Sequence, residues 1–182
     1  FIEVQNNFLI NENEIYKILG HLYNTNIFSI KSEDIEKPLK KIDFLERIEV
    51  KKKYPNRILI KVFETEPLAV IFKNKKKYLI DSTSNLILLK NNFNTENLPN
   101  VFGENSENKF VNFLNNLKKN GFPYEKVKNF YYFQIDRWDL QFFNDTKIKF
   151  PSSNINEAII KSIKLLDRED FSNYKIIDLR VD

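Results

Sequence analysis

Three groups of side chains in this sequence could carry chemistry. The single histidine, His21, could serve as a general base. Two carboxylate pairs, Glu64 with Glu66 and Asp136 with Asp139, could act as acid and base or hold a hard cation. A general base needs positioned partners, which His21 lacks at the end of an apolar helical stripe, and an oxygen-only cation site needs more ligands than one pair supplies. We therefore expect no catalytic, cofactor-binding or metal-binding residue.

The composition excludes further classes of protein. The chain of 182 residues has no cysteine, which excludes a disulfide scaffold, thiol catalysis and Cys-based zinc or iron–sulfur centres. Its three glycines, Gly20, Gly103 and Gly121, are isolated, so the sequence has no glycine-rich phosphate-binding loop. With 42% hydrophobic residues, including 17 Phe, the chain can bury a core of its own. We expect a folded protein that is not an enzyme.

The charge balance is weakly basic, with a net charge of +4. A nucleic-acid-binding surface favours arginine for base edges, whereas only 5 of the 29 basic residues here are arginine and 25 acidic residues are interspersed. Much of the lysine and asparagine excess fits an AT-rich coding bias, and the lysine runs are interpreted as solvated surface. A weaker alternative is attraction of these lysines to anionic lipid headgroups.

The first third of the chain has the pattern of a small α+β domain. A short alternating strand at its start precedes an apolar helical stripe, and alternating strands follow near residues 48–51 and 58–63. Ser32 opens a second helical run, in which Pro38 predicts a kink or two short turns. The first helical stripe consists of Ile15, Ile18, Leu19 and Leu22. The order is therefore β-α-α-β-β, and we expect the first domain to span residues 1–66.

The rest of the chain has the pattern of a second α+β domain, with a mostly antiparallel sheet. Expected strands lie at 68–72, 78–81, 86–89, 127–135, 138–143, 147–150 and 175–181. Expected helices begin at Ser106, with an apolar stripe ended by Asn120 and Gly121, and near residue 155. Residues 90–105 are predicted to form an Asn-rich loop. The second domain is expected to span residues 67–182.

Several motifs, taken in order, resemble one family. They are IFSI (27–30), FLERI (44–48), YPNRILIKV (54–62), ETEPLA (64–69), YLID (78–81), LPNVFG (98–103), RWDL (137–140) and IDLR (177–180). Together with the β-α-α-β-β order of a POTRA domain, they resemble the FtsQ/DivIB cell-division proteins, whose POTRA domain is followed by a second, β domain. Any one motif is weak, but their order spans most of the chain.

The resemblance implies a role and a location. It implies a non-enzymatic scaffold of the division machinery, the divisome, that links early and late division proteins and regulates septal peptidoglycan synthesis. It implies a single-pass inner-membrane protein with a transmembrane helix upstream of Phe1, this part being periplasmic at the division site. In this family the POTRA domain contacts other division proteins. The β domain binds FtsB and FtsL, and a strand from FtsB extends its last strand.

The last strand is compatible with that role. Alternation places Ile177 and Leu179 on an inward face and Ile176 and Asp178 on the other, where Arg180 could pair with an acidic partner. The expected partner-binding residues are Ile176, Ile177, Asp178, Leu179, Arg180, Val181 and, as a weaker candidate, Arg137. From the residues alone, a strand paired only within its own sheet is the favoured interpretation; the resemblance favours strand addition to an open edge.

An alternative function is a POTRA-bearing chaperone of outer-membrane protein assembly or secretion. Such proteins usually carry tandem POTRA repeats and then a barrel of alternating strands of about 10 residues. The present sequence has one POTRA-like unit and helical stripes after it, so the division scaffold is the preferred hypothesis.

Overall fold

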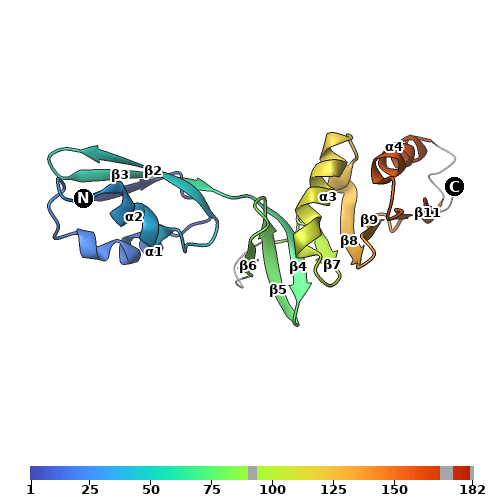
Figure 1. Cartoon of the computed structure of the whole chain (residues 1–182), viewed down its shortest axis with the longest axis horizontal. Helices are drawn as coiled ribbons and strands as arrows, with labels where there is room; N and C mark the ends of the chain where they lie inside the picture. The colour runs from blue at the N-terminus through green and yellow to red at the C-terminus, as the bar shows by residue number, and fades with distance from the viewer. Residues whose placement is uncertain (90–93, 169–173, 181–182) are drawn as a thin grey trace. The chain divides into compact units, whose positions relative to one another are not determined.

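The computed structural model of the chain describes residues 1–89, 94–168 and 174–180 (Figure 1). The chain divides into two compact units, Phe1–Glu66 and Pro67–Asp182, each with its own hydrophobic core. Among the described residues, no helix is both long and apolar enough to cross a membrane.

The first unit has the expected β-α-α-β-β order. Its elements are β1 (Ile2–Gln5), α1 (Glu12–Ile18), the short 3₁₀ helix η1 (Gly20–Leu22), α2 (Ser32–Leu39), β2 (Leu45–Lys53) and β3 (Arg57–Glu64). The strands form a sheet of order β1-β3-β2, with β1 parallel and β2 antiparallel to β3. The helices bury Ile15, Leu19, Ile35 and Leu39 against the sheet, where Ile60 is also fully buried. This arrangement confirms the expected POTRA-like fold.

Two helix details differ from the sequence predictions. The N-cap of α2 is Lys31 rather than Ser32, and the carboxylate of Asp34 accepts a hydrogen bond from the Lys31 backbone N–H at 2.8 Å. Pro38 does not divide the segment, because α2 is one helix that ends at the next residue, Leu39. At that position the missing proline N–H costs only one hydrogen bond of the last turn.

The carboxylate of Glu64 has a structural role at the end of β3. Its oxygens accept hydrogen bonds from the backbone N–H groups of Phe8, Leu9 and Ile10 at 2.8 to 3.0 Å. One side chain therefore satisfies three donors of the connection between β1 and α1. Glu66 is exposed and lies beyond the strand. In the pair of Glu64 and Glu66 that was considered as a cation site, the Glu64 carboxylate is therefore already bound to backbone N–H groups.

We predict that Glu64→Gln lowers the free energy of unfolding of the first unit by about 1–3 kcal/mol, because a charged acceptor of three N–H groups becomes neutral. The matched variant Glu66→Gln should change it by less than about 0.5 kcal/mol, as is usual for exposed sites. Hydrogen exchange under denaturant at the amides of the buried residues Ile60 and Val62, in the central strand β3, measures the free energy of unfolding for both variants. Equal effects of the two variants would contradict this role of Glu64.

The second unit is built on a larger mixed sheet. Its elements are β4 (Pro67–Lys73), β5 (Lys76–Asp81), β6 (Leu86–Leu88), β7 (Asn100–Phe102), α3 (Glu107–Lys119), η2 (Tyr124–Lys126), β8 (Val127–Phe133), β9 (Arg137–Phe142), β10 (Lys147–Lys149), α4 (Ile155–Leu166) and β11 (Ile176–Asp178). The strand order is β11-β10-β9-β8-β7-β4-β5-β6. Four of these seven pairings are antiparallel, and β4–β7, β7–β8 and β10–β11 are parallel.

The strand β7 lies inside the segment predicted to be a loop, so that prediction is wrong for residues 100–102. Three residues are too few to show a period, and the segment is extended because it pairs on both sides, with β4 and with β8. Val101 is fully buried in the core. The final strand is also shorter than expected, ending at Asp178 instead of Val181, which lies outside the described residues.

The helices α3 and α4 cover one face of this sheet. In α3, Phe110 meets Phe130 of β8 edge-on at 5.2 Å, and Phe113 stacks on Trp138 of β9 at 4.9 Å. Ala158 and Ile159 of α4 belong to the same core. Side chains that alternate with these core residues along the strands point to the opposite face of the sheet. That opposite face carries the charged residues described below.

Candidate partner-binding edge

The last strand, β11, lies at the edge of the larger sheet and pairs only with β10 among the described strands. The Lys147 N–H donates to the Lys175 carbonyl at 2.8 Å, and the Leu179 N–H donates to the Lys149 carbonyl at 2.9 Å. In a parallel strand, alternate residues direct both backbone groups to the same side. Residues 175, 177 and 179 therefore face β10, whereas Ile176 and Asp178 direct their N–H and C=O groups to the open side.

The side chains of this strand alternate as the sequence predicts. Ile177 and Leu179 are 5% and 9% exposed and belong to the core, whereas the Ile176 side chain is 54% exposed. Ile177 lies opposite Ile148 of β10, which holds the register of the edge. The edge is thus anchored by its inward residues. Outward it presents an apolar side chain and backbone groups that pair with no other described strand, which is the arrangement that accepts an added strand.

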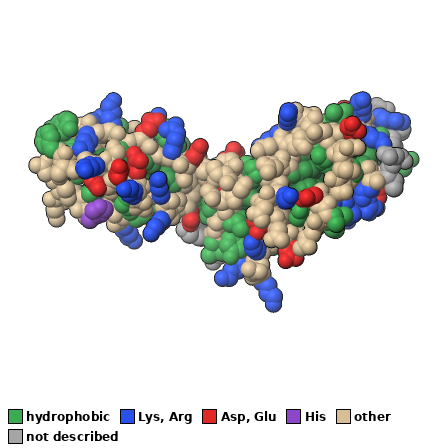
Figure 2. Space-filling model, in the orientation of Figure 1, with side chains coloured by type: hydrophobic (Ala, Val, Ile, Leu, Met, Phe, Trp, Pro, Cys, Tyr) green, Lys and Arg blue, Asp and Glu red, His purple; other side chains and the backbone are tan. Residues whose placement is uncertain are grey.

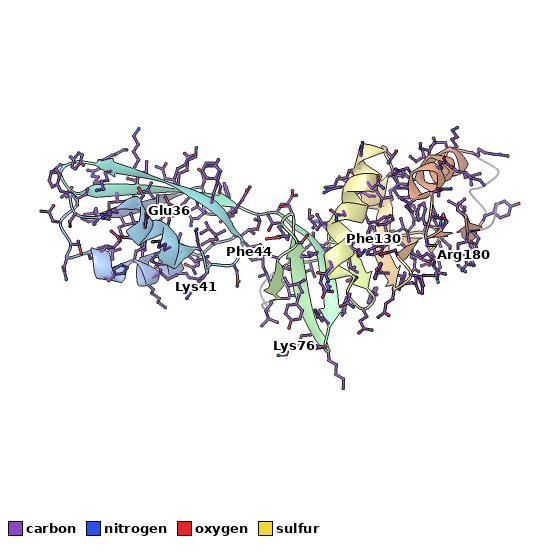
Figure 3. All side chains as sticks on the ribbon, viewed as in Figure 1. Glu36, Lys41, Phe44, Lys76, Phe130 and Arg180 are labelled. Atoms are coloured by element: carbon purple, nitrogen blue, oxygen red, sulfur yellow. The ribbon has the colours of Figure 1, made fainter. Side chains whose placement is uncertain are left out.

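A row of alternating charges crosses the three terminal strands on the face opposite the helices. Asp139 of β9 lies opposite Lys149 of β10, which lies opposite Asp178 of β11. Arg180, which is labelled in Figure 3, forms an ion pair with Asp178. Its guanidinium donates to the Asp178 carboxylate from Nε at 2.7 Å and from Nη2 at 2.5 Å. The Asp178 carboxylate also accepts from the Arg180 backbone N–H at 3.2 Å. This contact places the Arg180 side chain at the end of the open edge.

The hydrogen bonds from Arg180 lower the pKa of Asp178 to about 2, and the positive charges of Arg180 and Lys149 act in the same direction. Because the folded-state pKa is below the ordinary value of 3.8, the pair stabilises the fold above about pH 4. That stabilisation is lost as the pH falls through about 2. Asp178 is therefore ionised wherever the protein works near neutral pH.

We predict that Arg180→Gln raises the midpoint of the Asp178 carboxyl titration from about 2 toward 3.8, because the charge-assisted hydrogen bonds are lost. Carboxyl-carbon NMR measures the midpoint directly. Lys147→Gln, an exposed change on β10 away from this pair, is the control and should leave the midpoint in place. A midpoint that stays near 2 in Arg180→Gln would show that another group holds it there.

Arg137 lies on β9, two strands away from the edge, so it does not line the edge itself. Its guanidinium covers the ring of Phe133 at 4.0 Å, and its Nε lies 3.4 Å from Asp139 Oδ1. Neither of these two atoms has a hydrogen-bond partner in the described part of the chain. Burial raises the pKa of Asp139, against the opposing charges of Arg137, Lys149 and Arg180. Arg137 therefore shares the charge of Asp139 with Lys149 and Arg180, the cations nearer the edge.

The sequence reasoning missed Asp139 and Lys149 as members of this surface. Strand alternation within 137–142 and 147–149 shows which face each occupies, but only the register places them in one row. It also missed a hollow of about 280 Å³ beside the edge, whose lining includes Asn154, Glu157, Lys161 and Arg180. The turn at Asn154, with a φ of 54°, brings the start of α4 to the strand.

The other candidates for chemistry have local partners. The ring Nδ1 of His21 lies 3.2 Å from the Ile18 carbonyl oxygen, at the end of the first helix. Asp136 accepts from the Tyr132 hydroxyl at 2.8 Å and pairs with Lys109 at 2.9 Å. Across residues 1–89, 94–168 and 174–180, no three His, Asp or Glu side chains cluster as metal ligands would.

Both units of the chain match models of known protein families. Residues 2–65 match the model of the POTRA domain of FtsQ type, and residues 69–180 match that of the cell division protein FtsQ/DivIB C-terminal domain. The chain is 31% identical to the cell division protein FtsQ of Rickettsia typhi over 184 residues, covering 98% of this chain and 67% of that protein. The FtsQ of Rickettsia bellii is 30% identical over 181 residues, with the same coverage. That of Agrobacterium fabrum is 21% identical over 169 residues, covering 93% of this chain and 53% of that protein.

Proposed function

Because the chain belongs to the FtsQ/DivIB family of cell-division proteins, we propose that it is a non-enzymatic divisome scaffold that binds FtsB and FtsL through the open edge of β11. The FtsQ/DivIB match of residues 69–180 favours the division scaffold over the alternative of an outer-membrane chaperone. The scaffold would work at the division site, outside the cytoplasm, as part of a single-pass inner-membrane protein.

The observation that carries this proposal is the direction of the backbone groups of β11. Ile176 and Asp178 offer two N–H donors and two C=O acceptors to the open side, and the inward neighbours hold the strand in register with β10. A strand of FtsB that pairs with them would extend the sheet by one strand. The exposed Ile176 side chain would then be covered by an apolar partner residue.

The charges at this edge favour an acidic partner. The two outer strands β10 and β11, with the described residues that flank β11, carry Lys147, Lys149, Lys175 and Arg180 against Asp178. Arg180 lies at the end of the edge and is 36% exposed at its side chain, so a partner carboxylate can join its ion pair with Asp178. Complementary charge of this kind raises the association rate and fixes the register more than it adds affinity.

Calorimetric titration of this chain with the soluble extracytoplasmic segments of FtsB and FtsL from the same organism tests the proposal. We expect saturable binding with a Kd in the micromolar range or tighter, weakened when salt screens the charged row. The absence of any heat of binding at high micromolar concentration would overturn the assignment of FtsB and FtsL as partners.

A further inference from the structure

Two aromatic rings of the first unit stack on one another in water. Phe28, from the connection between η1 and α2, lies 4.8 Å from Tyr54, in the turn between β2 and β3, with the ring planes 17° apart. The Phe28 side chain is 71% exposed and that of Tyr54 is 60% exposed. Tyr23, 53% exposed, lines a hollow at the same end of the unit together with Pro55 and Asn56. We call Tyr23, Phe28 and Tyr54 the aromatic tip.

The backbone around the tip is held in place. Lys52 of β2 donates from Nζ to the Ile27 carbonyl at 2.7 Å, which ties the Phe28 loop to the strand that leads to Tyr54. The side chain of Asn26 accepts from the Phe28 N–H at 3.0 Å, and the Ser29 hydroxyl donates to the Asn26 carbonyl at 2.7 Å. The rings are therefore presented by a fixed support. Figure 2 shows hydrophobic side chains gathered at the end of this unit where Figure 1 places the β2–β3 turn.

The charged side chains on the two segments that carry the tip are of one sign. Residues 1–66 contain eleven basic and eleven acidic residues. The segments that carry the tip, 21–31 and 50–58, contain no Asp or Glu. Their basic residues are Lys31, Lys51, Lys52, Lys53 and Arg57. These two segments are therefore basic within a unit that is neutral as a whole, and Lys53 lies opposite Arg57 across the hairpin.

Exposed aromatic rings on segments rich in lysine suit the boundary between a lipid bilayer and water. Tyrosine rings sit at the level of the headgroups, and phenylalanine rings insert at the boundary between headgroups and acyl chains. Lysines near an anionic surface are attracted to it. We propose that the aromatic tip docks the first unit onto the headgroup layer of an anionic phospholipid bilayer. Three partly exposed rings offer on the order of 400 Å², about half of what one side of a stable protein interface buries. A bilayer, in contrast, needs no complementary pocket.

Sedimentation of the chain with vesicles tests the proposal. We expect it to bind phosphatidylcholine vesicles that contain phosphatidylglycerol and to bind pure phosphatidylcholine vesicles much more weakly. Phe28→Ser with Tyr54→Ser should reduce binding at least about tenfold, since both rings leave the interface. Lys51→Gln with Lys53→Gln should reduce it roughly 25-fold, at about fivefold for each lysine near the surface.

The opposite end of the same unit supplies matched controls. Phe8 is 88% exposed, and its backbone N–H bonds to Glu64, the last residue of β3, whereas the tip lies at the first residue of β3, Arg57. Lys40 and Lys41 shortly precede Leu45, the first residue of β2, whose last residue Lys53 adjoins the tip. Phe8→Ser and the Lys40→Gln, Lys41→Gln pair should bind vesicles as the unchanged chain does. No sedimentation with anionic vesicles would overturn the proposal, and so would equal losses in test and control variants. Because the tip variants leave β11 untouched, their titration with FtsB and FtsL segments should be unchanged, which separates this proposal from the scaffold function.

Discussion

Replacement of Ile176 by proline is expected to weaken binding of the FtsB and FtsL segments about a hundredfold while leaving the fold intact. The Ile176 N–H faces the open side of β11, so proline removes no hydrogen bond of the native sheet. It leaves a buried carbonyl of the added strand without its donor, at a cost of about 1–3 kcal/mol, and its ring obstructs the close approach of that strand. Calorimetry of the variant measures the loss, with circular dichroism as the check on folding.

The opposite edge of the same sheet provides the control. The Leu89 N–H donates to the Lys77 carbonyl, so its neighbour Leu88 on β6 directs its N–H away from β5, and its side chain is 50% exposed. Leu88→Pro therefore makes the same backbone change at the other edge, where no partner is proposed. It should leave the affinity unchanged. A folded Ile176→Pro variant that binds normally would remove strand addition at β11 from the account.

Gly103→Ala is expected to destabilise the second unit by about 3 kcal/mol or more. Gly103 has a φ of 121°, a conformation that side chains rarely adopt, and an added Cβ would lie 2.3 Å from the backbone oxygen of Tyr132 in β8. Because the obstacle is backbone within the sheet, it cannot move aside without breaking the β7–β8 pairing. Urea unfolding followed by fluorescence of Trp138, the single tryptophan, reports on this unit specifically.

Gly121→Ala is the control that separates the steric clash of an added Cβ from the energetic cost of a positive φ. Gly121 also has a positive φ, 73°, yet a Cβ there would meet no atom within 4 Å. We expect a loss of about 1–2 kcal/mol from the left-handed conformation alone. Equal destabilisation by the two variants would contradict the claim that close packing of residue 103 on β8 holds the centre of the sheet.

The periodic elements of this fold could be predicted from the sequence. The stripe Phe110, Phe113, Leu114 and Leu117 predicts α3, and Asn120 with Gly121 ends it, as the structure confirms. The three-residue strand β7 could not be predicted, because its conformation comes from pairing with β4 and β8 rather than from its own residues. The kink predicted at Pro38 is absent for a related reason, since the effect of a proline also depends on where the helix ends. A proline in the last turn of a helix disturbs little, and only the position of the helix end reveals that.

The inward and outward side chains of the candidate site could be predicted from the sequence, but the position of its strand in the sheet could not. Period-two spacing is enough to place Ile177 inward and Ile176 outward, as observed. Whether the strand is internal or at an edge depends on the strand order of the sheet. In that order β11, which follows α4 in the chain, pairs beside β10. The same order creates the row from Asp139 through Lys149 to Asp178, whose members are far apart in sequence. Binding at these residues stays a prediction.

Hydrogen exchange at the amides of β11 tests the central claim most directly. NMR exchange rates would be measured for the chain alone and saturated with the FtsB and FtsL segments. We expect the Ile176 and Asp178 amides, which face the open side, to exchange fast in the free chain and to become strongly protected in the complex. The Leu179 amide, already bonded to Lys149, should be slow in both states and serves as the internal reference. Saturated binding that leaves the Ile176 and Asp178 amides fast would contradict strand addition at this edge.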